Sequence, residues 1–126
     1  MKLQNKKILD FVNVNFAGKK LPVKLAYALS VNAEAVKPAL TAYNEQRQKI
    51  VEKYARKNEE GKPLTDNGCY LFDDVAGWNE SILELLEAEA EVNVTSVTLD
   101  DLEKCDDPSF DKLSVIELAA IGFMIA

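Results

Sequence analysis

Apolar side chains recur at helical spacing over an unusually long stretch of this chain, from Pro22 to Lys57. At about 1.5 Å per residue, a single helix over this stretch would be ~54 Å long. A compact chain of 126 residues is only about 36 Å across, judged from its expected radius of gyration. Such a helix must therefore bend, protrude or pair with another subunit. Its apolar face consists of Leu25, Leu29, Val36, Leu40, Tyr43, Ile50 and Tyr54.

Pro38 lies inside this stretch and disfavours an unbroken helix. Proline has no amide hydrogen, its ring clashes with the carbonyl of the residue one turn earlier, here Glu34, and it moves the preceding residue away from helical dihedral angles. We therefore expect a long second helix with a kink or a break between Asn32 and Pro38.

Two further elements are predicted on either side of this helix. Apolar residues at helical spacing behind Asn5, a suitable N-cap, predict a short first helix that ends before Gly18. Asn67 and Gly68 lie between two short strand-like runs, which is the strongest hairpin signal in the chain. The expected strands of this hairpin are Leu64-Thr65-Asp66 and Cys69-Tyr70-Leu71-Phe72.

The C-terminal half continues with helix, strand, loop and helix. Asp73 and Asp74 can cap a helix that ends near Ala90, with an apolar face of Trp78, Ile82, Leu85 and Leu86. Alternation from Val92 to Leu99, with one slip of phase, predicts a bulged strand that joins the hairpin in one sheet. After an acidic loop, a capping box of Ser114 and Glu117 opens a last, nearly all-apolar helix that reaches Met124 and should be core.

The expected fold is one α+β domain over residues 1–126, dominated by helices and with a small antiparallel sheet. Apolar residues make up 48% of the chain, which suits a single hydrophobic core. No stretch approaches the ~20 apolar residues that a membrane-spanning helix needs, so we expect no membrane partner.

Charge is distributed unevenly along the chain. The net charge is −6, but the first half to Pro63 carries +7 and the second half −13. Two helical stripes stand out, a basic one of Lys49, Lys53, Arg56 and Lys57 and an acidic one of Glu80, Glu84, Glu87 and Glu91. They either flank an antiparallel packing of the two helices or face water, or they present separate faces to an anionic ligand and to a basic protein surface. The acidic total makes nucleic acid an unlikely partner.

Two clusters are candidates for partner binding. The acidic cluster lies in a region predicted to be a loop with at most one helical turn, and it lacks the spacing of a calcium loop. Mimicry of a phosphate backbone or docking to a basic protein surface is therefore a better interpretation than a metal site. Its alternative is a solvated loop. Three lysines near Gly18 could hold an anion, although they lack a phosphate-loop motif and could equally be solvated. The clusters are Asp100, Asp101, Glu103, Asp106, Asp107 and Asp111, and Lys19, Lys20 and Lys24.

The chain contains no histidine, which removes the commonest general base and the commonest zinc ligand. Cys69 and Cys105 have no Cys-x-x-Cys companion and are expected to be reduced, structural thiols. No nucleophile, base and oxyanion stabiliser can be assembled from the motifs. We therefore expect a protein that is not an enzyme and that uses no cofactor and no metal.

Several segments in this order resemble a family of small, functionally uncharacterised proteins of tailed phages and prophages of Gram-positive bacteria. The matching segments include Gly18 to Leu29, Tyr43 to Arg47, Glu52-Lys53-Tyr54, Glu60-Gly61-Lys62, Asn67-Gly68, Leu83 to Leu86, Glu89 to Val92, Leu99 to Leu102 and Leu118 to Ile125. Pro38 departs from the unbroken helix of that pattern.

The resemblance implies a product of the infected bacterial cytoplasm that acts by stoichiometric binding. One expectation is an accessory protein that blocks a host factor, such as a factor of anti-phage defence. The alternative is a component of virion morphogenesis, in head or tail assembly, that forms a homo-oligomer through its long helix and is found in the virion.

Overall fold

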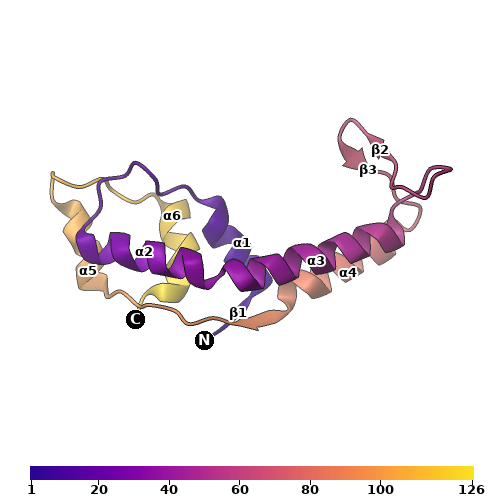
Figure 1. Ribbon diagram of the computed structural model, residues 1–126. Helices are drawn as coiled ribbons and strands as arrows, with labels where there is room; N and C mark the ends of the chain where they lie inside the picture. Colours follow the sequence, from indigo (N-terminus) through magenta and orange to yellow (C-terminus); the bar gives the residue numbers. More distant parts are fainter.

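Helices carry most of the chain in the computed structural model, which describes residues 1–126 (Figure 1). The four longer helices are α1 (Asn5–Asn13), α2 (Val23–Ala35), α3 (Lys37–Tyr54) and α4 (Val75–Glu87). The short ones are α5 (Leu99–Glu103) and α6 (Val115–Ala120), with 3-10 segments η1 (Lys104–Asp106) and η2 (Gly122–Met124). The strands are β1 (Lys2–Gln4), β2 (Thr65–Asp66), β3 (Cys69–Tyr70) and β4 (Glu89–Glu91). The expected helix-dominated α+β class is confirmed.

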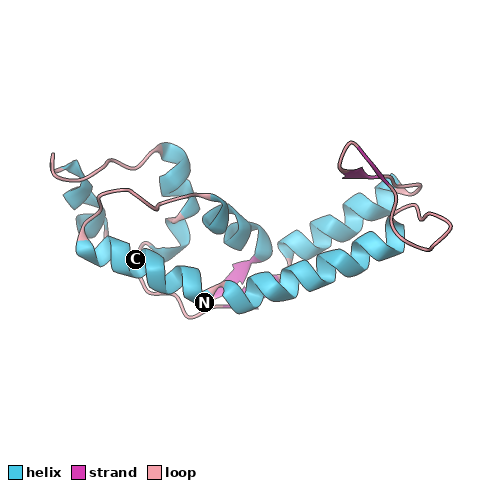
Figure 2. Ribbon diagram, turned by 45° about the horizontal axis from the view of Figure 1, so that its top comes forward, coloured by secondary structure: helices cyan, strands magenta, loops and turns pink.

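The molecule has two regions of different shape. Helices α3 and α4 run antiparallel and project as an arm, with β2 and β3 at its far end (Figures 1 and 2). We call residues 37–87 the arm and all other residues the body. The stretch from Pro22 to Lys57 is too long for one straight helix inside a compact domain. It is divided into α2 and α3, and α3 projects from the body.

The break lies at Val36, between α2 and α3, as the position of Pro38 predicts. The Val36 amide still donates to the Asn32 carbonyl (3.1 Å), so α2 closes with an intact turn. Pro38 falls in the first turn of α3, where an amide hydrogen would have no partner within the helix. The two helices follow one another with a change of direction (Figure 2).

The strands form two separate antiparallel sheets, not the single expected one. β1 pairs with β4, with Lys2 opposite Glu91, and β2 pairs with β3 at the tip of the arm. The tip hairpin is confirmed, and Asn67 and Gly68 both have positive φ (51° and 80°). The bulged strand from Val92 to Leu99 is wrong. The preceding residues pair with the chain's own start instead, a partner that local alternation cannot reveal.

Side-chain caps set the starts of three helices. The Gly77 amide donates to Asp74 (2.9 Å), which confirms the expected cap of α4. Ser114 and Glu117 form the expected capping box at α6, and Thr98 and Asp101 form a second box that starts α5. The acidic region read as a loop therefore contains α5 and η1.

Two expectations about helix ends are corrected. The C-terminal helix α6 stops at Ala120, and its first residues Val115 and Ile116 are 83% and 75% exposed, so it is not a core helix throughout. Asn5 is not an N-cap. Its buried amide instead donates to the Leu85 carbonyl (2.8 Å) and ties α1 to the end of α4.

The hydrophobic core lies in the body, where α1, α2, the segment after β4 and the C-terminal residues meet. Asn32 is buried at its centre and exchanges two hydrogen bonds with the Thr95 backbone (2.9 and 2.7 Å). None of the helices combines the length and the hydropathy that crossing a membrane requires. The buried cluster consists of Leu3, Ile8, Phe11, Leu25, Ala28, Leu29, Val36, Val92, Val97, Cys105, Ile121 and Met124.

Candidate interaction surfaces

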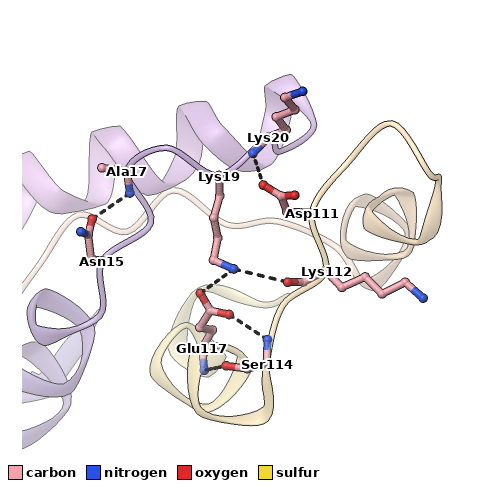
Figure 3. A network of polar contacts seen from close by, with 8 residues as sticks. All are labelled: Asn15, Ala17, Lys19, Lys20, Asp111, Lys112, Ser114 and Glu117. Atoms are coloured by element: carbon pink, nitrogen blue, oxygen red, sulfur yellow. Dashed lines mark hydrogen bonds and ion pairs between the residues drawn. The ribbon is translucent and has the colours of Figure 1, made fainter.

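The two clusters predicted to bind partners lie against one another in the body. The Lys20 amide donates to Asp111 Oδ2 (2.7 Å), and the Asp111 amide donates to the Lys20 carbonyl (2.8 Å), as Figure 3 shows for the first contact. These reciprocal bonds join the segment before α2 to the segment before α6. Asp111 is therefore engaged within the chain and does not offer a free carboxylate to a partner.

Lys19 is engaged in the same network (Figure 3). Its Nζ lies 3.2 Å from Glu117 Oε2 and 3.4 Å from the Lys112 carbonyl. Glu117 also accepts from the Ser114 amide (2.8 Å), and this bond is the main cause that holds the pKa of Glu117 below its ordinary value. Lys19 adds to that lowering. The lysine thus anchors the cap of α6, and an incoming anion would have to displace a carboxylate from it.

Asp101 is the buried member of the acidic cluster, with 5% of its surface exposed. It accepts from the Thr98 amide (3.0 Å), and this bond is the main cause that lowers the pKa of Asp101. The ammonium groups of Lys24 and Lys104 each lie 3.8 Å from its Oδ1 and lower the pKa further. Asp101 is a capping residue of α5 with two nearby cations, not a freely exposed docking residue.

Lys20 and Lys24 are the members of the lysine cluster with exposed side chains. Lys24 borders a hollow of about 500 Å³ that also contains Lys104, Glu103 and Asp107 in its lining. Two cations face two carboxylates there, so the hollow has no excess of positive charge. An anion site at these lysines stays a prediction of the sequence.

Three acidic residues of the cluster are exposed and have neither an ion pair nor a side-chain hydrogen bond, namely Asp100, Glu103 and Asp106. Asp107 instead accepts from the Ser109 amide (2.8 Å), which lowers the pKa of Asp107. No group of three or more carboxylate or thiol side chains is arranged to hold a metal ion.

Glu103 and Asp106 both line a mainly apolar hollow of about 340 Å³. Lys112 is the single cation of its lining. Cys105 forms part of the wall as a free, buried thiol, and burial together with the Asp106 charge raises the pKa of this thiol. The apolar lining also contains Leu99, Leu102, Leu113 and Leu118. This hollow combines apolar contact with unpaired negative charge.

A larger hollow of about 580 Å³ lies between α1, the segment that follows it, α2 and the start of α3. Of its 14 lining residues, 11 are hydrophobic, and the others are Lys19, Ser30 and Lys37. Both lysines already have carboxylate partners, Glu117 and Glu34. The lining of this hollow is therefore mainly apolar and carries no unpaired charge.

Sequence reasoning did not predict the larger hollow. The sequence does contain one signal for this hollow. Apolar residues continue past the end of α1, at Val14 and Phe16, into a segment without regular structure. Apolar residues in such an irregular segment indicate that the segment lies against another apolar surface, which here belongs to α2. Comparisons of this chain with protein-family models, with characterised proteins and with solved structures found no match.

Proposed function

We propose that this protein acts by stoichiometric binding to another protein and performs no catalysis. The partner is a factor of a bacterial host, such as a component of anti-phage defence, and binding takes place in the cytoplasm of the infected cell. This proposal joins the resemblance to small phage proteins with the surface around α5, η1 and α6.

The observation that carries the proposal is the hollow lined by Glu103 and Asp106. Both carboxylates are unpaired and lie beside apolar side chains, among them Leu99, which is 62% exposed. Val115 and Ile116, in the first turn of α6, add exposed apolar surface to the same helix as Leu118. Apolar area supplies affinity in protein interfaces, and charge at the rim supplies orientation and specificity.

This combination defines the chemistry of the partner. A protein segment that inserts an apolar side chain and carries Lys or Arg beside it would satisfy both the leucines and the two carboxylates. A phosphate or a nucleic-acid backbone would instead be repelled by Glu103 and Asp106.

The test is affinity capture from a lysate of a Gram-positive host, with identification and quantification by mass spectrometry. The wild-type protein should retain one host protein at a constant ratio, and less of it as salt is raised, because rim charges are screened. A variant with Glu103→Lys and Asp106→Lys should lose it. The matched control, Glu45→Lys with Glu52→Lys, makes the same charge change on the arm and should retain it. Equal capture by all three proteins would refute the proposed surface.

Virion morphogenesis is the second candidate, and the arm is the observation that favours it. A projecting pair of helices is a means by which one subunit reaches another in an assembly. Mass spectrometry of purified virions distinguishes the two functions. Presence of the protein in the particle at a fixed copy number would support assembly and would count against the role as an inhibitor of a host factor.

A further inference from the structure

The packed seam of the arm is formed by α3 and α4, and α1 contacts both of these helices at the base of the arm (Figure 1). Tyr43 and Val51 of α3 are buried, but α4 contains no buried residue at all. The apolar positions of α4 that face α3 are half-buried, and they include Trp78, Ile82 and Leu85. An amphipathic helix normally buries such a face against two or more neighbours. The arm thus has half the helices of a four-helix bundle.

The charged stripes of the arm are not used within it. Lys49, Lys53, Glu80, Glu84 and Glu87 are exposed, and none of them forms an ion pair in the chain. Like charges at this spacing repel one another by a few tenths of a kcal/mol in a helix. Neither stripe therefore stabilises its own helix.

Two other members of the stripes have partners at the two ends of the arm, whereas Lys57 forms no ion pair. Arg56 contacts Asp73 (2.6 Å) near the tip, and Glu91, beyond the end of α4, contacts the N-terminal ammonium group (2.9 Å). Lys53 lies 5.1 Å from the ring of its neighbour Tyr54 but has no carboxylate partner. The middle of the arm therefore offers free cations on α3 and free carboxylates on α4.

The two stripes lie on the same side of the arm. Lys49 and Lys53 each directly precede a residue of the packed seam, Ile50 and Tyr54, and Glu84 likewise precedes Leu85. In two antiparallel right-handed helices, positions that precede the packed residues fall on the same side of the pair. One face of the arm thus presents a basic helix beside an acidic helix.

The total surface leaves room for an interface of ordinary size. The chain exposes 8293 Å², whereas a compact monomer of this mass exposes about 6,700 Å². A stable protein interface removes about 800 Å² from each partner. The excess of roughly 1,600 Å² is more than one such interface requires, and the projecting arm is the part of the molecule that departs most from a compact shape.

We propose that the occupant of this face is the arm of a second copy of the chain, in a twofold dimer. A twofold interface needs a surface that is complementary to itself, and a basic helix beside an acidic helix meets that requirement. Lys49 and Lys53 of each copy face the acidic stripe of the other, and the two pairs of helices together form a four-helix bundle. This dimer is independent of the binding to a host factor proposed above, whose surface lies around α5, η1 and α6.

The test uses charge reversal and sedimentation velocity. The wild-type chain should be a dimer at about 0.05 M salt and should dissociate at about 1 M, where the Debye length falls to about 3 Å. One variant carries Lys49→Glu and Lys53→Glu, and a second carries Glu80→Lys and Glu84→Lys. Each should be monomeric, with the dissociation constant raised more than about 100-fold by repulsion between like charges. Far-UV circular dichroism confirms that each variant is folded.

Mixing the two variants provides the decisive measurement. The first has two acidic helices and the second has two basic ones, so an equimolar mixture should form a heterodimer. The control with Glu103→Lys and Asp106→Lys makes the same charge change at exposed residues of the body, away from the arm, and should dimerise like the wild type. A wild-type chain that is monomeric at both salt concentrations would overturn the proposal, as would reversal variants that still form homodimers.

Discussion

In the body, twelve residues form one buried cluster, whereas in the arm the whole of α4 contains no fully buried residue. The body joins segments that are distant in the chain, such as β1 with β4 and Val97 with Ile125. The arm joins two helices that are adjacent in the chain and are connected through residues 55–74, which contain the tip hairpin. The body therefore holds most of the buried apolar surface, and we expect the arm to open by local unfolding at a lower free energy than the body.

Removal of a core side chain from the body should have the largest effect. Leu25 is 0% exposed, so Leu25→Ala should lower the free energy of unfolding by about 2–5 kcal/mol, through lost burial and the cavity that remains. The matched change in the arm, Leu83→Ala, removes a side chain that is 55% exposed and should cost less than about 0.5 kcal/mol. Urea unfolding of both variants measures the difference. Equal losses would contradict the division into body and arm.

A glycine at the start of α4 tests the arm alone. A Cβ at Gly77 would meet the Asp74 carboxylate and would lie 2.8 Å from Cε1 of Tyr54, so Gly77→Ala should displace the cap or the packed ring. We expect a cost of about 1–3 kcal/mol, as for other overpacked sites. Hydrogen exchange should quicken at the amides of α3 and α4 and stay unchanged in α2.

The control for this prediction is Gly122→Ala in the body, where an added Cβ meets nothing within 4 Å. That variant should exchange like the wild type. Faster exchange throughout the body of the Gly77→Ala variant would show that the arm and the body unfold together, and would contradict the independent opening of the arm.

Acidification should change the free energy of unfolding least of the three perturbations, and it should destabilise the body. Asp101 and Glu117 have lowered pKa values in the fold, so their stabilisation is present above the ordinary carboxyl pKa of about 4 and is lost as pH falls through the lowered values. A double variant with Asp101→Asn and Glu117→Gln should show a flatter decline of stability between about pH 5 and pH 2. Unfolding at a series of pH values measures it. A decline as steep as that of the wild type would assign the acid sensitivity to other groups.

The features that could be predicted from the sequence are those made by neighbours in the chain. The break before Pro38, the turn at Asn67 and Gly68 and the caps at Asp74 and Ser114 each depend on contacts within about four residues. The cap at Thr98 is equally local but was not predicted, because its partner is Asp101 instead of the Glu or Gln of the usual capping box.

The residues of the candidate surfaces could be predicted from the sequence, but which of them are free to bind a partner could not. The acidic cluster was found by its density of carboxylates, yet its members differ in the fold: Asp101 and Asp111 are engaged, and Glu103 and Asp106 are free. The partners of the engaged residues include Lys20, 91 residues away along the chain. A high density of charged residues in a sequence does not show which of them form ion pairs or hydrogen bonds within the fold.

By itself the sequence determined the four longer helices, the caps at Asp74 and Ser114, the break in the long apolar stretch and the hairpin at the tip of the arm, because short-range sterics and hydrogen bonds decide these. Only the tertiary structure decided that Lys2 to Gln4 pair with Glu89 to Glu91, that the Lys19 to Lys24 region packs against the acidic segment, and that the stripe residues in the middle of the arm form no ion pair. Contacts of this kind depend on how distant segments pack around a shared core, and no local pattern encodes that arrangement.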